Sequence, residues 1–252
     1  LNIPDWLKNS WLKQYGKITT NKIINSIFEE PIIDLKIKRN INNLKKSLNA
    51  KILIKNTLRL KSKGDIKSLE GFKEGMWWVQ DIAAQLPVKI MGNIKNKNII
   101  EICGAPGGKT AQMLNEGAAV TTIEISKRRA LMLKNNIERL KLESKIKIIC
   151  EDARKWVPEK KADITLVDVP CSSTGTLRKN PDVMWLKSQE DIKELVSLQK
   201  ELLAAAIKCT NKKGIIIYCN CSLQFEEGES VVDYFLQNSL VKLTKVNKKN
   251  IN

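Results

Sequence analysis

Between residues 98 and 235, short apolar runs alternate with segments whose apolar residues recur at helical spacing. The expected strands cover residues 98–103, 119–125, 146–150, 164–169 and 214–219, and the clearest helices cover residues 126–140 and 189–208. Short runs of apolar and β-branched residues are typical of strands that are buried on both faces. Strands connected through helices form a parallel sheet with right-handed crossovers. The sequence therefore predicts an α/β fold with a Rossmann-like, doubly wound sheet.

The residues before this region follow a different pattern. We expect helices over residues 4–15 and 20–29, a half-buried strand through Ile33, Leu35 and Ile37, a short helix around Leu44, one strand over residues 53–60 and a helix over residues 80–91. Lys and Arg are frequent from Lys36 to Lys63, which indicates either a solvated face or a nucleic-acid platform. We expect two domains, a basic α/β lobe at residues 1–71 and a second domain at residues 72–252.

Composition removes several classes of function. The chain has no His, which excludes Ser-His-Asp catalysis, Cys-His proteases and zinc sites with His ligands. No pair of cysteines has CxxC spacing, so we expect no metal. No apolar run approaches the length of a membrane span, so we expect no membrane and a cytoplasmic location. The formal net charge of +17 favours a polyanion as the partner, although Lys is abundant throughout.

The loop after the first strand of the alternating region, in the segment EICGAPGGKT, points to a nucleoside ligand. Its glycines do not have the GxGxxG spacing of a dinucleotide site, and a P-loop would need Gly where the chain has Cys103. Glu124 ends the next strand, where a carboxylate can accept both hydroxyls of a ribose. Asp152 follows the third strand, where a carboxylate could face an adenine amino group. A nucleoside without a polyphosphate fits better than NAD or ATP, and S-adenosylmethionine is such a ligand.

The fourth strand ends in a second candidate site. Asp168 and Cys171 lie at its carboxyl end, which is where open α/β sheets bind ligands. Arg178 and Lys179 follow in the same loop and could hold a phosphate. The alternative is structural, because a strand-end Asp can cap a turn and a Cys can fill a core.

Four segments resemble one family in the right order. EICGAPGGKT is similar to the cofactor loop of the RsmB/NSUN-type RNA cytosine-5 methyltransferases, CEDARKW to their third-strand segment, DVPCSSTGTLRKNPDVMW to their Pro-Cys signature and IYCNCSLQFEEGE to their second cysteine signature. GFKEGMWWVQDIAAQL and PDWL match as well. The resemblance covers nearly all of residues 4–240 and is greatest for the bacterial 16S ribosomal RNA members.

This resemblance implies a class I methyltransferase fold and a covalent mechanism. Cys221 would be the nucleophile that adds to carbon 6 of cytosine, and Cys171 would help to release the product. Asp168 would contact N3 and the amino group of the ring. The implied contacts with S-adenosylmethionine are Cys103, Gly104, Ala105, Pro106, Gly107, Gly108, Lys109, Glu124, Arg129, Asp152 and Asp168. Arg178 and Lys179 would bind RNA, while Cys150, Cys209 and Cys219 are expected to be core residues.

The sequence departs from the family pattern at several places. Glu124 stands where the family usually has Asp, and Asn220 stands where a Thr usually precedes the second cysteine. We expect the upstream helical RNA-binding domain of many bacterial members to be absent, and the last antiparallel strand of the family's sheet to be missing after Gln237. Because of these departures, we expect the chain to be either a fragment of a longer protein or the product of a shortened gene.

The expected function is methylation of carbon 5 of a cytosine in RNA, with ribosomal RNA as the first choice and transfer RNA as the alternative. The alternative function that is not enzymatic is that of a truncated, inactive RNA-binding or assembly protein. A P-loop NTPase is the third interpretation and is disfavoured by Cys103. We expect a monomer.

Overall fold

The computed structural model describes residues 3–61, 64–238 and 240–246. The chain divides into two compact units, and each is described by itself. The first unit contains the described residues of Leu1–Pro31, Asp168–Ala204 and Tyr218–Lys245, and the second contains those of Ile32–Val167, Ala205–Ile217 and Val246–Asn252. Both units therefore contain segments that are far apart in the sequence.

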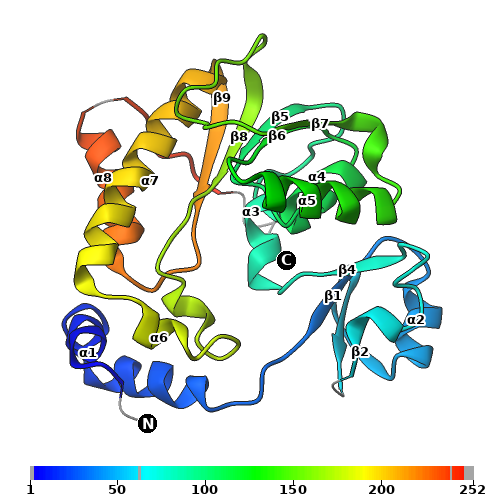
Figure 1. Cartoon of the computed structure of the whole chain (residues 1–252), viewed down its shortest axis with the longest axis horizontal. Helices are drawn as coiled ribbons and strands as arrows, with labels where there is room; N and C mark the ends of the chain where they lie inside the picture. The colour runs from blue at the N-terminus through cyan, green and yellow to red at the C-terminus, as the bar shows by residue number, and fades with distance from the viewer. Residues whose placement is uncertain (1–2, 62–63, 239, 247–252) are drawn as a thin grey trace. The chain divides into compact units, whose positions relative to one another are not determined.

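A five-stranded sheet with the order β7-β6-β5-β8-β9 forms the centre of the expected α/β fold (Figure 1). Its strands are β5 (Asn98–Ile102), β6 (Ala119–Ile123), β7 (Ile146–Ile149), β8 (Ala162–Asp168) and β9 (Thr210–Cys219). The pairs β5–β6, β6–β7 and β5–β8 are parallel, and Ile100 lies opposite both Thr121 and Thr165. The order runs from β5 to β7 in one direction and then from β8 to β9 in the other, so the switch point lies between β5 and β8. Ligands of such sheets bind outside the carboxyl ends of the strands at this point.

Helices follow β5, β6, β8 and β9, and those expected over residues 126–140 and 189–208 are present. Helix α4 (Gly108–Asn115) follows β5, and α5 (Lys127–Arg139) follows β6 after its N-cap Ser126, whose hydroxyl accepts from the Arg129 N–H. Helices α6 (Val183–Leu186) and α7 (Gln189–Cys209) connect β8 to β9, and α8 (Glu229–Gln237) follows β9. The helix expected over residues 80–91 is wrong in length, because only α3 (Leu86–Lys89) is α-helical after a 3-10 turn. In the described residues after α8, no strand is present.

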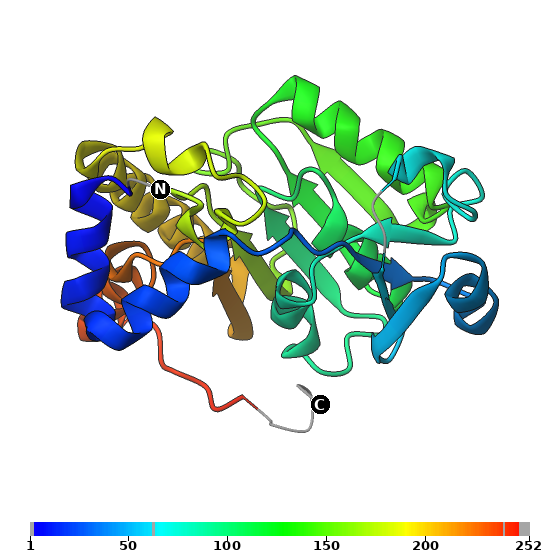
Figure 2. The ribbon, with the colours of Figure 1, turned by 90° about the horizontal axis from the view of Figure 1, so that it is seen from below.

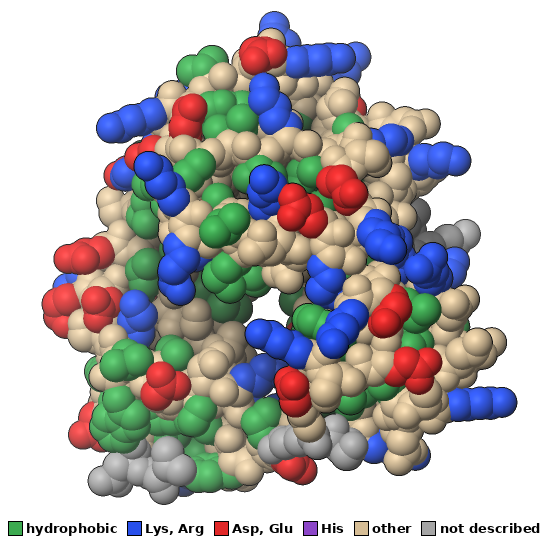
Figure 3. Space-filling model, turned by 45° about the vertical axis from the view of Figure 1, so that its right-hand side comes forward, with side chains coloured by type: hydrophobic (Ala, Val, Ile, Leu, Met, Phe, Trp, Pro, Cys, Tyr) green, Lys and Arg blue, Asp and Glu red, His purple; other side chains and the backbone are tan. Residues whose placement is uncertain are grey.

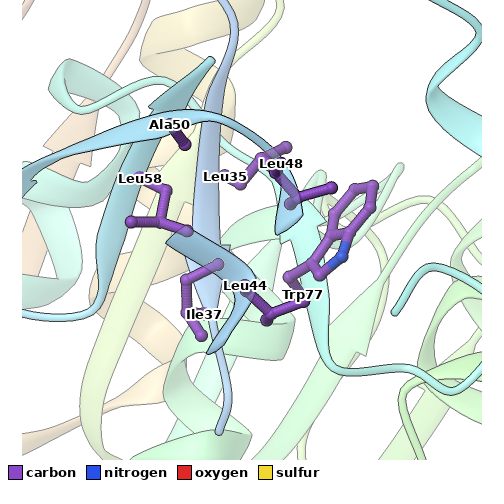
Figure 4. Packing of buried hydrophobic residues seen from close by; sticks show 7 residues of the cluster. All are labelled: Leu35, Ile37, Leu44, Leu48, Ala50, Leu58 and Trp77. Atoms are coloured by element: carbon purple, nitrogen blue, oxygen red, sulfur yellow. The ribbon is translucent and has the colours of Figure 1, made fainter. Parts of the chain in front are cut away.

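A smaller antiparallel sheet, with the order β2-β3-β1-β4, also belongs to the second unit. It consists of β1 (Asp34–Ile37), β2 (Ala50–Ile54), β3 (Thr57–Leu60) and β4 (Trp77–Val79), with α2 (Ile41–Ser47) between β1 and β2. Its core is formed by apolar side chains from all four strands and from α2 with its end (Figure 4): Leu35, Ile37, Leu44, Leu48, Ala50, Leu58 and Trp77.

Two expectations for this sheet are wrong. The strand after Pro31 is buried on both faces rather than half-buried, since Asp34 is 2% exposed and Lys36 is 6% exposed. Asp34 is stabilised there by two hydrogen bonds from the guanidinium of Arg59 on β3, at 2.7 and 3.0 Å. The single strand expected over residues 53–60 is a hairpin, because Asn56 adopts a left-handed conformation (φ 58°) and reverses the chain.

The first helix, α1 (Asp5–Ile27), belongs to the first unit and bends at Gly16 (Figure 2). Gly16 has φ 72°, which is accessible to glycine at little cost, so α1 consists of two helical segments that meet at a kink, as the two expected helices predicted. Leu7 and Trp11 of α1 pack against Leu177 and Met184. The helix is thereby joined to the segment that follows β8.

The expected domain boundary at residues 71 and 72 differs from this grouping of the chain. Residues 1–31 belong with the segments after β8 and β9, and the small sheet belongs with β5 to β7, because the contacts join segments that are distant in the sequence. Whether residues 1–71 act together as an RNA-binding lobe stays a prediction.

Candidate active site

The predicted cofactor loop of the second unit makes a tight turn from β5 into α4. Cys103 adopts a left-handed conformation (φ 64°) while its N–H donates to the Ile123 carbonyl at 2.9 Å. A Cβ on Gly104 would lie 2.1 Å from Thr122 Oγ1 and 2.5 Å from Glu101 Oε2, so no other residue fits without a shift. Glu101 also accepts a hydrogen bond from Thr110 of α4, at 2.5 Å. The loop is thus pressed against the ends of β5 and β6.

Glu124 supplies a buried acceptor at the end of β6. The residue is 3% exposed, and its Oε1 accepts from the Ser126 N–H at 3.1 Å. Its Oε2 has no hydrogen-bond partner among the described residues, although Arg129 Nε lies 3.4 Å away as an ion pair. Arg129 also donates to the Ala105 carbonyl, at 2.6 Å. An acceptor oxygen without a donor fits the hydroxyl of a ribose, which is what the sequence predicts here.

Asp152 lies after β7, as expected, but its carboxylate already has a partner. Arg154 binds it through the guanidinium, at 2.7 and 2.9 Å, and through the backbone N–H. The hydrogen bond from Arg154 lowers the pKa of Asp152 despite some desolvation. Asp152 is therefore held as an anion, an acceptor of the kind that an exocyclic amino group requires. Lys109 lies half-buried in the first turn of α4.

In the first unit, the loops after β8 and β9 bring the two predicted cysteines together. Cys171 Sγ and Cys221 Sγ are 3.3 Å apart, and the Cys221 N–H donates to Cys171 Sγ at 3.4 Å. Ser173 Oγ lies 3.4 Å from Cys221 Sγ. Cys171 is half-buried and Cys221 is exposed. Two thiols in contact, one of them accessible, suit a nucleophile with a neighbouring proton carrier.

The contact with Cys221 makes the Cys171 thiol hold its proton more firmly. The hydrogen bond with Cys221, burial and the charge of Cys221 all raise the pKa of Cys171. Two thiolates at this distance would repel each other strongly, so the pair carries at most one negative charge. Cys171 consequently keeps its proton while Cys221 is a thiolate.

The other cysteines differ partly from expectation. Cys209 is buried, as expected for a core residue, but Cys150 is exposed, so that prediction is wrong. Cys219 ends β9 and its thiol donates to Asp168 Oδ1 at 3.4 Å, which connects it to the candidate site rather than to the core alone. Asp168 itself is the last residue of β8, as predicted.

The two predicted RNA ligands have partners within the first unit. Arg178 Nη1 forms an ion pair with Glu29 Oε2 at 2.7 Å. The backbone N–H of Lys179 donates to the Thr176 carbonyl. A phosphate would therefore compete with Glu29 for the guanidinium. On the face shown in Figure 3, Lys and Arg side chains are scattered among acidic ones rather than gathered in one patch.

Sequence reasoning did not identify the residues that surround the cysteine pair. Ser173 and Glu227 are the clearest cases, and Glu227 is 0% exposed with its carboxylate bonded to Ser172. Its sequence context, FEEGE, reads as an exposed acidic turn, so no signal in the sequence distinguishes it.

The described residues contain neither a membrane-spanning helix nor a cluster of metal ligands. No helix within residues 3–61, 64–238 and 240–246 is long and apolar enough to cross a membrane. No group of three or more acidic, cysteine or histidine side chains in the same residues has the geometry of a metal site.

Known proteins resemble this chain in sequence and fold. A family model described as 16S rRNA methyltransferase RsmB/F matches residues 89–252. The chain is 36% identical over 188 residues to ribosomal RNA small subunit methyltransferase B of Proteus mirabilis, covering 73% of this chain and 44% of that protein. It is 32% identical over 249 residues to the protein of the same name in Photorhabdus laumondii, covering 93% and 57% respectively. The chain thus spans about half the length of these curated relatives.

A solved structure shares the fold over most of its length. NSun6 from Pyrococcus horikoshii, solved with SFG, superposes with a TM-score of 0.85 at 19% identity, over 97% of this chain and 89% of that one.

Proposed function

The chain belongs to the RsmB/F family of 16S rRNA methyltransferases, and on this premise we propose that it methylates carbon 5 of a cytosine in RNA, with ribosomal RNA as the substrate and S-adenosylmethionine as the methyl donor. The observation that carries the proposal is the contact between Cys171 Sγ and Cys221 Sγ, at 3.3 Å, in the loops that follow β8 and β9. Carbon 5 of cytosine is a weak nucleophile, and addition of a thiolate to carbon 6 is what activates it.

The cofactor would be held by the loop from Cys103 to Lys109, with Glu124 and Arg129 at the ribose and Asp152 at the adenine. Two observations support this fit: the turn leaves no room for a side chain at Gly104, and Glu124 Oε2 has no hydrogen-bond donor among the described residues. When bound, S-adenosylmethionine supplies the electrophilic methyl group that becomes attached to carbon 5.

The chain's own residues perform the remaining steps. Cys221 Sγ forms a bond to carbon 6, and the electron pair of the carbon 5–carbon 6 double bond becomes available at carbon 5. Asp168 would contact N3 and the amino group, where charge changes as the thiolate adds. After carbon 5 has been methylated, Cys171 takes the proton from carbon 5. The double bond re-forms, the bond between carbon 6 and sulfur breaks, and its electron pair returns to Cys221.

The raised pKa of Cys171 gives these steps an order. The hydrogen bond and the charge of Cys221 keep Cys171 protonated as long as Cys221 is a thiolate. Once Cys221 Sγ is bonded to carbon 6, it no longer carries a charge, and two of the three causes of the raised pKa are gone. The Cys171 thiol then loses its proton to solvent more readily, and the resulting thiolate is the base that takes the proton from carbon 5.

The wider setting of the reaction is also part of the proposal. A thiol can reach carbon 6 only if the cytosine is single-stranded or turned out of its helix. Arg178 and Lys179 would bind the RNA backbone. We place the protein in the cytoplasm, as a monomer, with transfer RNA as the alternative substrate.

RNA that contains 5-azacytidine tests the proposal. Nitrogen at position 5 carries no proton to remove, so the adduct with Cys221 cannot be released and should survive on a denaturing gel. Cys221→Ala should form no adduct and have no turnover. Cys171→Ala should lose turnover but accumulate an adduct on unmodified RNA when S-adenosylmethionine is present.

Other outcomes separate the alternatives. An adduct with Cys221→Ala but not with Cys171→Ala would reverse the two roles. Wild-type protein that binds RNA without forming any adduct would favour the inactive RNA-binding protein. Thermal stabilisation by ATP but not by S-adenosylhomocysteine would favour the P-loop interpretation.

A further inference from the structure

A buried carboxylate lies between the two loops that carry the cysteines. Glu227 ends the 3-10 turn Phe225–Glu227 and is 0% exposed, whereas Glu226 and Glu229 in the same segment are exposed. No Lys or Arg forms an ion pair with Glu227 in the described part of the chain. A buried carboxylate without a cation must be stabilised by hydrogen bonds, and the donors to the Glu227 carboxylate come from the loop of Cys171 and from α7.

The carboxylate of Glu227 fixes the loop of Cys171. Its Oε1 accepts from the Ser172 N–H at 2.8 Å and from Gln199 Nε2 at 3.0 Å, and its Oε2 accepts from the Ser172 hydroxyl. Gln199 Nε2 also donates to the Pro170 carbonyl at 2.9 Å. The residues on both sides of Cys171 are therefore attached, directly or through Gln199, to one carboxylate.

The backbone of the same residue fixes the loop of Cys221. The Glu227 carbonyl accepts from the Tyr218 hydroxyl at 2.7 Å and from Asn220 Nδ2 at 2.9 Å. Asn220 directly precedes Cys221. Its Oδ1 accepts from the Ser222 N–H at 2.8 Å, so it attaches the residues on both sides of Cys221.

We propose that Glu227 is a positioning residue that sets the spacing between the Cys171 and Cys221 thiols, with Gln199 and Tyr218 as its supports. The carboxylate meets only donors: an N–H, a hydroxyl and an amide NH2. A glutamine of the same shape lacks the charge that strengthens all three hydrogen bonds, and its NH2 group would reverse the bond with the Ser172 hydroxyl, so the site favours the negative, acceptor-only group. The consequence for turnover rests on the proposed function, but the consequence for the spacing of the thiols does not.

Phenylarsine oxide tests the spacing without any methyl transfer. One arsenic atom condenses with two thiols and releases water, so tight binding requires both sulfurs at a suitable distance. We expect the wild type to bind one equivalent, and Cys171→Ala gives the affinity of a single thiol. Glu227→Gln should weaken binding by about tenfold or more, because the second thiol is no longer held near the first. Glu229→Gln, with the same change of charge at an exposed position of the same segment, should bind like the wild type.

Turnover provides the second measurement. Glu227→Gln should lower kcat by roughly a hundredfold, as expected for a misplacement of about 1 Å, and leave KM for S-adenosylmethionine unchanged. Glu227→Asp, which keeps an acceptor-only group, should recover part of kcat. Tyr218→Phe removes one hydroxyl and provides a milder variant if Glu227→Gln lowers Tm.

The outcomes can be distinguished. Wild-type arsenical affinity in both Glu227→Gln and Tyr218→Phe would overturn the positioning role. If the wild type binds the arsenical as expected but transfers no methyl group, the proposed function fails while the positioning role stands.

Discussion

At the scale of single residues, the cysteine pair is the feature on which the proposed function rests. Cys171 and Cys221 are in sulfur contact, and only Cys221 is exposed. The two thiols cannot both be charged, because a second negative charge at 3.3 Å is unfavourable. The accessible thiol can then act as the nucleophile and the half-buried thiol can carry the proton.

This difference predicts how alkylation depends on pH. Iodoacetamide reacts with thiolates, and the raised pKa of Cys171 should place its alkylation midpoint above the ordinary range of a thiol. Cys221→Ala removes the hydrogen bond and the charge next to Cys171, but Cys171 stays partly buried. The alkylation midpoint of Cys171 should therefore move to lower pH, while it stays above the ordinary range of a thiol. Mass spectrometry of the Cys171 peptide measures this, with the exposed Cys150 as an internal control. A midpoint that does not move in Cys221→Ala would show that the neighbouring sulfur is not the cause.

The sequence indicated the candidate catalytic residues more clearly than the residues around them, and their roles stay predictions. Asp168, Cys171 and Cys221 belong to recognisable motifs and follow strands, which is where chemistry occurs in this fold. Glu227 could not be found in this way, because its burial depends on loops that come from distant parts of the chain. Cys150 was wrongly predicted to be a core residue for a similar reason, because an apolar run does not show whether other parts of the chain bury its last residue.

At the scale of elements, the turn between β5 and α4 is the most sterically restricted part of the cofactor loop. Gly104→Ala would place a methyl group 2.1 Å from Thr122 Oγ1, and the resulting shift should cost about 1–3 kcal/mol and abolish cofactor binding. Titration calorimetry with S-adenosylhomocysteine measures the effect.

Gly64→Ala is the control, at a glycine outside the cofactor loop. No heavy atom lies within 4 Å of a Cβ added to Gly64, so this substitution should be tolerated. Equal affinities for Gly104→Ala and the wild type would contradict the steric argument.

Helix α1 is the element whose role the sequence did not indicate. Trp11 is 0% exposed, and its Nε1 donates to Gln224 Oε1 at 2.8 Å, while the Tyr15 hydroxyl donates to the Leu223 carbonyl at 2.5 Å. Trp11 also packs against Leu177. The helix therefore braces the segments that follow both cysteines.

Two substitutions at Trp11 separate packing from hydrogen bonding. Trp11→Ala should destabilise the protein by about 3–5 kcal/mol, as for other buried aromatic residues. Trp11→Phe keeps most of the ring and should cost about 1 kcal/mol for the lost hydrogen bond. Ile18→Ala, at a position that is 75% exposed on the same helix, should change stability by less than about 0.5 kcal/mol. Urea unfolding measures the free energy of unfolding of all three variants. An unchanged free energy of unfolding in Trp11→Ala would contradict the bracing role.

Periodicity predicted the parallel sheet because its strands are short, continuous apolar runs. It failed in the small sheet, where two details depend on partners. Lys36 is buried although its neighbours alternate in polarity, and the turn at Asn56 lies in a run that reads as one strand. Neither the burial of Lys36 nor the turn at Asn56 can be predicted without knowing which strand lies beside it.

At the scale of the whole molecule, the net charge of +17 predicts salt-dependent binding of RNA. Within the stretch from Lys36 to Lys63, Lys45, Lys46 and Lys51 are exposed, while Lys36 is buried and Lys63 lies outside the described residues. Each neutralised phosphate of single-stranded RNA adds roughly 0.7 to the slope of log affinity against log salt.

Charge reversal tests whether this stretch contacts phosphates. Changing Lys45, Lys46 and Lys51 to Glu should reduce the slope by about 2, measured by fluorescence anisotropy from low to high salt. The matched control reverses Lys208, Lys212 and Lys213, which are also exposed. Equal slopes for the two triple variants would leave the lobe as an ordinary solvated surface.

The grouping of the chain could not be predicted from linear order. Composition changes near residue 71, but α1 belongs with loops more than 150 residues away, as in the hydrogen bond between Trp11 and Gln224. Boundaries read along a sequence do not detect units assembled from three separate segments.

The sulfur contact also makes the protein sensitive to oxidants. A peroxide that converts the exposed Cys221 to a sulfenic acid would leave a thiol 3.3 Å away to displace water and form a disulfide. Peroxide should therefore inactivate the wild type with the loss of two hydrogens, and dithiothreitol should restore it. In Cys171→Ser, which has no resolving thiol, oxidation should proceed to the irreversible sulfinic acid. The neighbour that carries the proton would thus also protect the nucleophile from permanent damage.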